Sequence, residues 1–178
     1  MKRVKKEHKK KIMEMIEKAG DPNNYETSWD GNGIPHISKK KSEIKKGKSS
    51  RARGARFELK VRGELEAQGW IMDKWTNNVD LEENKIIKAK RKYNPFKKML
   101  IVGVGFPDFI AFKRTSKKSY EVIGVEVKIN GILSKIEKEK CAWYLNNEIF
   151  SRILVAKQGA KRGQTEYVDF AERYKNKL

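Results

Sequence analysis

The middle of the chain holds two carboxylates and an amine at a spacing that suits metal chemistry. Asp108 follows Pro107, and Glu126 and Lys128 lie on either side of Val127. In a strand, residues two apart point to the same face, so Lys128 lies beside Glu126. Two nearby carboxylates repel each other, and a divalent cation that prefers oxygen ligands, Mg²⁺ or Mn²⁺, removes that repulsion. Such a cluster is suited to holding a metal ion against a phosphodiester.

A hairpin is expected to position these side chains. Residues 107–113 and 121–128 are apolar and aromatic enough for strands, and the polar stretch between them is typical of a turn. With Lys117 at the centre of the turn, Asp108 lies directly opposite Glu126. Opposed residues share a face, with roughly 5 Å between their Cβ atoms. The pattern therefore predicts that the two carboxylates meet at one end of the hairpin.

The alternative is a surface hairpin with ordinary charges on its wet face. Both faces of the expected hairpin are apolar, however, and such a hairpin is covered on both sides. Charged residues at a covered end are costly unless they are paired, which favours a functional cluster. The apolar residues on the carboxylate face are Ile110, Phe112 and Val122, and those on the other face are Phe109, Ala111, Val125 and Val127.

The chain is strongly basic. Its 178 residues include 42 Lys and Arg against 23 Asp and Glu, which gives a net charge of +19. This length allows one ordinary domain plus an extension. A one-sided excess of positive charge points to a polyanionic partner, of which nucleic acid is the first candidate. A thermophile surface enriches both signs of charge together, so it explains only part of the pattern.

The cysteine content and the lack of long apolar runs predict an intracellular (cytoplasmic) protein without a membrane span. Cys141 is the only cysteine, so no disulfide forms within the chain, and we interpret it as a small buried residue. With His8 and His36 as the only histidines, soft ligands are too few for zinc. No apolar run reaches the roughly 18 residues of a membrane helix, and the basic N-terminus lacks the apolar centre of a secretory signal.

We expect two parts, an N-terminal helix and basic arm at residues 1–50 and a main domain at residues 51–178. Residues 2–19 carry a broken apolar stripe typical of a helix. Packing on the core, pairing with a second chain and lying along nucleic acid are all compatible with that helix. Residues 21–50 contain little core material and are predicted to be a loop or linker.

A dense basic run joins the two parts. From Lys39 to Arg62 there are 11 basic residues, opposed only by Glu43 and Glu58. Such a run is usually a solvated surface, but this one leads directly into the helix expected at the site, which favours a phosphate-binding arm. The residues expected to contact nucleic acid here are Lys45, Lys46, Lys48, Arg51, Arg53 and Arg56.

That helix is predicted over residues 53–68, and it carries a possible third carboxylate. Its apolar stripe starts at Phe57 and recurs every four residues, with Glu58 on the border of the stripe. An acid beside a buried face needs a partner. Arg62, four residues further on, would supply one. Together with the two carboxylates of the hairpin, Glu58 instead becomes a candidate ligand.

A first strand is predicted over residues 70–77, and a polar insertion over residues 78–98. In the insertion Tyr93 and Phe96 are interleaved with cations, which suits a surface that follows a nucleic-acid backbone and stacks on bases. A mobile basic loop explains the same pattern equally well. The cations expected to contact nucleic acid here are Lys90, Arg91 and Lys92.

The remaining elements complete an α/β pattern. Ser134 and Glu137 form a capping box, which opens a helix that runs to about Asn147. Residues 152–157 are continuously apolar, as in a strand buried inside a sheet. The tail, residues 166–175, is expected to end in a helix.

This order of elements resembles the core of the PD-(D/E)xK nuclease superfamily, and most of all the archaeal Holliday-junction resolvases and related small endonucleases. The resembling segments are Gly54-Ala-Arg-Phe-Glu58, Gly69-Trp70, Gly105-Phe-Pro-Asp108 and Val125-Glu-Val-Lys128. The resemblance covers roughly residues 50–157. It implies an α/β fold with a restriction-endonuclease-like core, a central mixed β-sheet flanked by α-helices.

The resemblance also implies an activity and a set of roles. Asp108 and Glu126 would bind Mg²⁺ or Mn²⁺ with help from the Val127 carbonyl. Glu58 would bind the metal directly or through water, and Lys128 would orient the attacking water and stabilise charge on the phosphate. The implied protein is a metal-dependent endodeoxyribonuclease that acts as a homodimer on branched DNA. A restriction-like or repair nuclease is a variant of this interpretation, and a non-catalytic basic DNA- or RNA-binding protein is the alternative.

Overall fold

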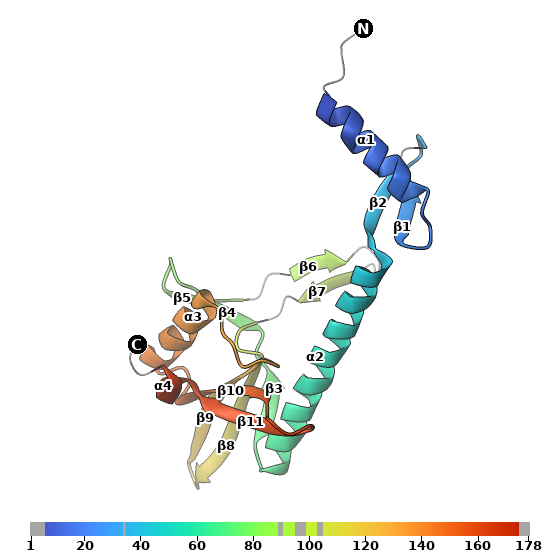
Figure 1. Cartoon of the computed structure of the whole chain (residues 1–178). Helices are drawn as coiled ribbons and strands as arrows, with labels where there is room; N and C mark the ends of the chain where they lie inside the picture. The colour runs from blue at the N-terminus through green and yellow to red at the C-terminus, as the bar shows by residue number, and fades with distance from the viewer. Residues whose placement is uncertain (1–5, 34, 89–90, 95–98, 103–104, 175–178) are drawn as a thin grey trace. The chain divides into compact units, whose positions relative to one another are not determined.

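The computed structural model describes residues 6–33, 35–88, 91–94, 99–102 and 105–174 (Figure 1). The chain divides into two compact units, Met1–Arg53 and Gly54–Leu178. The long helix α2 (Lys41–Ala67) continues across this boundary, so a helix stands where a linker was expected near residue 50. None of the helices in the described part of the chain has the length and apolar character needed to cross a membrane.

The first unit contains helix α1 (Lys6–Ala19) and an antiparallel hairpin of β1 (Tyr25–Trp29) and β2 (Pro35–Lys40). The predicted N-terminal helix is confirmed from residue 6 onward, and its first residues, 2–5, lie outside the described ranges. The loop predicted over residues 21–50 is wrong, because it contains both strands and the start of α2. Strand β1 is short and mostly exposed, so it buries too little apolar surface to leave a clear pattern.

Helix α2 begins well before the predicted start at Arg53. Its N-terminal half is rich in Lys, Arg and Ser and largely exposed, so no apolar stripe marks it. Lys and Arg nevertheless have good helix propensity, which permits a helix there. The predicted end is confirmed, because α2 stops at Ala67 and Gly69 adopts a positive φ of 85°, a conformation typical of the residue that follows a helix.

The second unit is built on a mixed five-stranded sheet in the order β11-β10-β9-β8-β3. Strands β9 and β10 are parallel, and the other neighbours are antiparallel. The strands are β3 (Ile71–Lys74), β8 (Phe109–Ser116), β9 (Ser119–Val127), β10 (Arg152–Gln158) and β11 (Thr165–Asp169). The predicted α/β class with a mixed sheet and helices is confirmed.

The hairpin of β8 and β9 has the predicted register. Phe109 pairs with Val125 and Lys113 with Glu121, so the same register continued by one residue sets Asp108 opposite Glu126. Strand β10, predicted as buried, lies between β9 and β11 inside the sheet. The hairpin therefore adjoins the interior strand β10 and carries both carboxylates at the end away from its turn.

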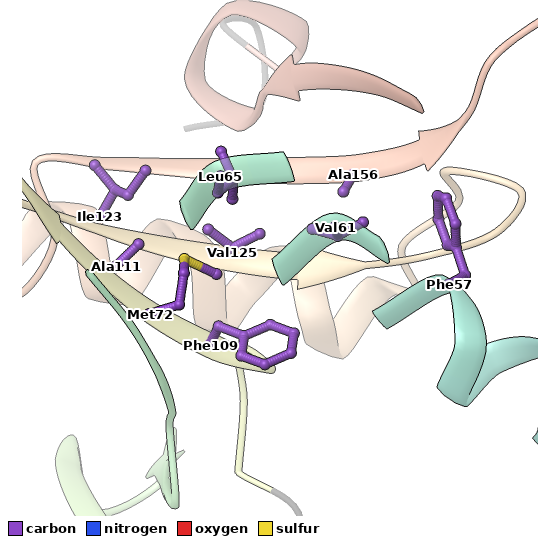
Figure 2. Close-up of a cluster of buried hydrophobic side chains, with 9 residues drawn as sticks. All are labelled: Phe57, Val61, Leu65, Met72, Phe109, Ala111, Ile123, Val125 and Ala156. Atoms are coloured by element: carbon purple, nitrogen blue, oxygen red, sulfur yellow. The ribbon is translucent and has the colours of Figure 1, made fainter. Parts of the chain in front are cut away.

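Both faces of the sheet are covered, as the apolar pattern of the hairpin predicted. On one face, the C-terminal half of α2 packs Phe57, Val61 and Leu65 against residues of β3, β8, β9 and β10 (Figure 2). On the other face, helix α3 (Lys135–Asn146) and the short helix α4 (Phe170–Arg173) cover a second cluster, in which Cys141 and Tyr144 are fully buried. Cys141 is free and buried, as expected.

The polar insertion contains strands that were not predicted. The first strand was expected to reach residue 77, but β3 ends at Lys74 and β4 (Asn77–Asp80) begins a new hairpin with β5 (Lys85–Lys88). A second hairpin joins β6 (Arg91–Asn94) to β7 (Met99–Val102). Val79 is buried in the second cluster, so the interpretation of this segment as a basic loop is wrong for its described residues.

The C-terminal elements were predicted in part. The capping box is present, since Ser134 Oγ accepts from Glu137 N–H at 3.3 Å and Glu137 Oε2 accepts from Ser134 N–H at 2.7 Å. The tail does end in a helix, α4, but strand β11 precedes it. That strand lies at a sheet edge and is half-buried throughout, so its pattern is weak.

One glycine fixes the approach to the site. A Cβ on Gly105 would overlap the carbonyl oxygens of Trp75 and Asn77, because the chain before Pro107 passes directly over the link between β3 and β4. We expect Gly105→Ala to destabilise the protein by about 1–3 kcal/mol in urea unfolding. Gly63→Ala, in an open position on α2, is the control and should stabilise by about 0.5–1 kcal/mol. Equal effects of the two substitutions would contradict this role of Gly105.

Candidate active site

Asp108 and Glu126 are locked together by two hydrogen bonds. The backbone N–H of Asp108 donates to Glu126 Oε2 at 3.1 Å, and the backbone N–H of Val127 donates to Asp108 Oδ2 at 2.9 Å. Glu126 thus accepts a hydrogen bond from the backbone of Asp108 itself, and Asp108 accepts one from the residue that follows Glu126. The predicted convergence of the two carboxylates is present, and main-chain donors fix their orientation.

Burial makes this pair electrostatically unusual. Glu126 is 3% exposed and is the buried charged residue of the described chain. Burial, and then the neighbouring Asp108, raise the pKa of Glu126 to about 7. Burial also raises the pKa of Asp108, and the charge of Glu58 adds to that effect. Two acids whose ionised forms are both disfavoured form a site that gains from a bound cation.

Lys128 connects this pair to helix α3. Its Nζ lies 3.0 Å from Glu126 Oε1 and 2.7 Å from Glu137 Oε1. Burial alone would lower the pKa of Lys128, but the bonds to Glu137 and Glu126 outweigh burial and raise it. Bonds from Lys128 and Ser134 likewise outweigh burial and lower the pKa of Glu137. The amine is therefore charged and held from two sides.

Glu137 is a site residue that the sequence interpretation missed. It was assigned only to the capping box of α3, yet the same carboxylate caps Ser134 N–H with Oε2 and binds Lys128 with Oε1. The separation of Lys128 and Glu137 along the sequence gives no periodic signal, because a loop lies between them. A glutamate at the start of a helix that follows a Glu-x-Lys strand is the feature that could have pointed to it.

Glu58 is placed beside the pair but bonded elsewhere. Its Oε2 accepts from Lys74 Nζ at 2.6 Å, and not from Arg62, which binds Glu66 instead. Lys74 Nζ also lies 4.1 Å from the centre of the Phe109 ring, next to Asp108 in the chain. Lys74 on β3 is thus a second residue that the sequence interpretation missed. Because Glu58 is paired with Lys74, it does not join Asp108 and Glu126 as a ligand in this geometry.

Pro107 leaves the Val127 carbonyl oxygen without a ladder hydrogen bond, next to the carboxylate pair. Val127 N–H points across the hairpin to Asp108, and in a strand the carbonyl of a residue points to the same edge as its N–H. The continued register sets Pro107 opposite Val127, and proline has no N–H to donate. The Val127 carbonyl therefore receives no ladder bond from residue 107. Gly124 allows this arrangement, since a Cβ there would lie 2.9 Å from Pro107 Cγ.

Within the described residues, no group of three or more His, Cys, Asp or Glu side chains is arranged to hold a metal ion. The structure brings together two of the three predicted carboxylates, Asp108 and Glu126, with Lys128. Mg²⁺ is commonly held by one or two carboxylates together with water and substrate phosphates. A two-carboxylate site with a nearby carbonyl matches that coordination habit.

The predicted nucleic-acid contacts fall in two places. On α2 the six basic side chains, Lys45, Lys46, Lys48, Arg51, Arg53 and Arg56, are all exposed. Arg91 and Lys92 belong to strand β6, and Lys90 lies outside the described residues. The exposed cations of α2 are thus the part of this prediction that the structure places on a defined surface.

Comparisons with protein-family models, curated proteins and solved structures find no match to this chain. Its function therefore has to be argued from the site itself.

The buried carboxylate of Glu126 predicts a pH-dependent stability in the absence of metal. Its folded-state pKa of about 7 exceeds the ordinary 4.5, so the folded protein binds a proton that the unfolded chain releases between these values. The free energy of unfolding in EDTA should then fall as the pH rises from 4.5 to 7, by roughly 3 kcal/mol, and level off above. Glu126→Gln cannot ionise and should lose this slope in urea unfolding at pH 5 and pH 8. Matching slopes for the two proteins would contradict the assignment.

Because Glu137 accepts hydrogen bonds from both Lys128 and Ser134, substitutions can separate its role in the site from its role in folding. Glutamine at the same helix position preserves a capping box, so Glu137→Gln should keep the stability of α3 while removing the charge that holds Lys128. If the site is catalytic, its reaction should slow by about 10- to 100-fold in Glu137→Gln, because a misplaced Lys128 amine loses that much. Glu137→Ala should in addition lose about 1 kcal/mol of stability through the missing cap. Full activity of Glu137→Gln would assign this residue to the cap alone.

Proposed function

We propose that this chain is a metal-dependent endodeoxyribonuclease of the PD-(D/E)xK type that hydrolyses phosphodiesters in branched DNA. The observation that carries the proposal is the bonded pair of Asp108 and Glu126 at the end of a covered hairpin, with the Lys128 amine 3.0 Å from Glu126. A purely structural role does not explain why two acids with disfavoured charge are kept side by side. A protein that only binds DNA gains nothing from acids that face phosphate.

The residues fit a divalent cation. The donors are two carboxylates and the Val127 carbonyl, and hard oxygen ligands suit Mg²⁺ or Mn²⁺. When bound, such an ion would lower the pKa of a water molecule and neutralise charge on the phosphate oxygens. Asp108 and Glu126 would hold it, and their mutual repulsion would be relieved on binding. Glu58 would join through water after release from Lys74.

Lys128 supplies a positive charge near the phosphate when Asp108 and Glu126 are bound to the metal ion. Glu137 holds its amine from the side of α3, so Lys128 keeps its position if Glu126 turns to another partner. A fixed ammonium beside the scissile phosphate stabilises charge that develops on the phosphoryl oxygens, and it can orient the attacking water by a hydrogen bond. Both roles require the Lys128 amine to be in a fixed position, and its bonds to Glu126 and Glu137 fix that position before the substrate binds.

The arrangement of elements supports the proposed restriction-endonuclease-like core. Helix α2 contributes Glu58, and the adjoining ends of β8 and β9 carry Asp108, Glu126 and Lys128. Helix α3 then follows along the chain, and strand β10 pairs in parallel with β9 on the side away from β8. The basic surface of α2 is suited to the DNA backbone. A homodimer would let two such sites cut two strands of one junction.

A non-catalytic DNA- or RNA-binding protein is the second candidate. One observation favours it, since Lys128 already neutralises Glu126 and Lys74 already neutralises Glu58. In that case the acids would be satisfied structural residues, and the exposed basic side chains of α2 would contact the nucleic-acid backbone.

A cleavage panel separates the two candidates. Purified protein is incubated with supercoiled plasmid and with linear, nicked, flapped and four-way synthetic DNA, in Mg²⁺, Mn²⁺ or EDTA. We expect metal-dependent cleavage, with a branched substrate cut fastest and the two strands of a four-way junction cut in symmetry-related positions. Binding to all substrates without cleavage in either metal would support the binding protein instead.

A further inference from the structure

We propose that the hollow between α3 and α4 binds a single unpaired nucleotide of the DNA, next to the proposed cleavage site. The hollow has a volume of about 410 Å³ and is lined by Lys135, Lys138, Glu139, Ala142, Phe170 and Tyr174. Pockets that take small ligands have volumes of about 300–1,000 Å³, so one nucleotide fits. The inference deepens the proposed function, because it rests on DNA as the substrate and names the part of the DNA that is recognised.

The lining combines the two kinds of group that a nucleotide needs. Phe170 and Tyr174 line one wall with ring centres 5.0 Å apart, and Tyr174 is the ring that a base can reach because Phe170 is only 2% exposed. The ammonium of Lys138 lies over the Tyr174 ring, 4.9 Å from its centre, and the Lys135 side chain is 91% exposed at the rim. A base can stack on an aromatic ring whatever its sequence, while amines contact the adjoining phosphate. Lys138, on a flexible stem, can exchange the ring for that phosphate.

Both walls of the hollow are tied to the segment that carries Lys128. Lys135 begins α3, and Glu137 in the same helical turn accepts the hydrogen bond from Lys128 at 2.7 Å. On the other side, Arg173 of α4 donates to the Gly131 carbonyl at 3.0 Å, in the loop that leads from Lys128 to α3. The first turn of α3 thus contributes both Lys135 at the hollow and the Glu137 partner of the Lys128 amine. A DNA strand with one phosphate at Lys128 can reach the hollow within a few nucleotides.

Such a site favours DNA that has unpaired nucleotides. A base inside a duplex is stacked and paired, and it enters a pocket only after it is turned out of the helix. Nucleotides at a junction centre, in a flap or in a single-stranded end need no such step. The hollow would therefore bias binding towards these structures, whereas the exposed cations of α2 contact the backbone of any DNA.

The test measures binding without cleavage. Full-length protein in EDTA is titrated with a single-stranded DNA that carries one fluorescent 2-aminopurine and with the blunt duplex of the same sequence. The variant Lys135→Gln/Lys138→Gln removes the amines, and Tyr174→Leu removes the ring. The control, Lys117→Gln/Lys118→Gln, removes the same charge from the turn of the β8–β9 hairpin. Tyr174→Phe keeps the ring and should bind like the wild type.

We expect the amine variant and Tyr174→Leu each to lose about tenfold or more in affinity for the single strand, with a smaller loss for the duplex, and 2-aminopurine quenching to fall in Tyr174→Leu. If the single-strand affinity of the amine variant falls no further than that of the control, the pocket does not bind a nucleotide. Equal losses of affinity for the single strand and for the duplex would also overturn the inference. Wild-type cleavage in Mg²⁺ is scored separately, so loss of the nucleotide site and loss of the nuclease proposal are distinct outcomes.

Discussion

Asp108→Asn should abolish metal-dependent cleavage while leaving the fold intact. The asparagine carbonyl can still accept the Val127 N–H bond that Asp108 Oδ2 accepts at 2.9 Å, so the end of the hairpin keeps its geometry. What disappears is one of the two charges that would hold the cation. A bound metal supplies several kcal/mol of transition-state stabilisation, so we expect a loss of at least about 10³-fold in cleavage rate.

Binding and stability should change in the opposite direction. Removal of a negative charge beside phosphate leaves DNA affinity in EDTA equal or greater, and it relieves the repulsion that raises the pKa of Glu126. Asp73→Asn, on the exposed part of β3, removes the same charge outside the pair and is the control. It should cut at close to the wild-type rate. If Asp108→Asn retains wild-type cleavage, the site is misplaced.

The parts of the site that sequence predicted are those with a short-range periodicity. In a hairpin with a compact turn, the position of the turn fixes the register, and the alternation of apolar residues fixes the two faces. Both could be derived for β8 and β9, and they set Asp108 opposite Glu126. The end of α2 and the cap of α3 were equally local signals, carried by Gly69 and Ser134.

The parts that sequence missed depend on contacts between distant segments. Glu58 has a suitable partner one helical turn away in Arg62, yet it binds Lys74 on the adjoining strand. Glu137 reaches Lys128 only because the loop after β9 returns α3 to that strand. The N-terminal half of α2 and the described insertion hairpin of β4 and β5 bury little apolar surface, so neither leaves a periodic pattern to read. Propensity alone decides these elements, and it is a weak guide.

These misses change what the site is expected to do before metal arrives. Glu58, Asp108, Glu126 and Glu137 would together carry a large negative charge in a partly buried place. Lys74 binds one of these acids and Lys128 binds two, so these two amines offset half of that charge within the protein. A cation must compete with two internal amines, which lowers its affinity for the free protein. A DNA phosphate can replace Glu58 at Lys74 and Glu126 at Lys128 while Glu137 still holds Lys128, so metal and substrate are expected to bind with positive coupling.

Neutralisation of the basic helix should produce the largest effect on DNA binding. Lys45, Lys46, Arg51 and Arg53 are exposed on the N-terminal half of α2, where Glu43 is the nearby acid. Replacement of all four with Gln should weaken DNA binding on the order of 100-fold at low salt. It should also reduce the slope of log K against log salt concentration by about 0.9 for each phosphate that the protein no longer neutralises, and by about 3.6 if all four side chains touch phosphate.

The salt slope separates direct binding of the backbone from a general reduction of charge. A second variant replaces Lys117, Lys118, Lys161 and Arg162, which are exposed in two turns of the second unit, and it changes the net charge equally. If the helix binds the backbone, only the α2 variant flattens the slope strongly, because counterions are released only where phosphates are neutralised. Equal slopes for both variants would mean that α2 attracts DNA at long range without touching it. Fluorescence anisotropy with one labelled duplex, across a salt series in EDTA, measures both variants without interference from cleavage.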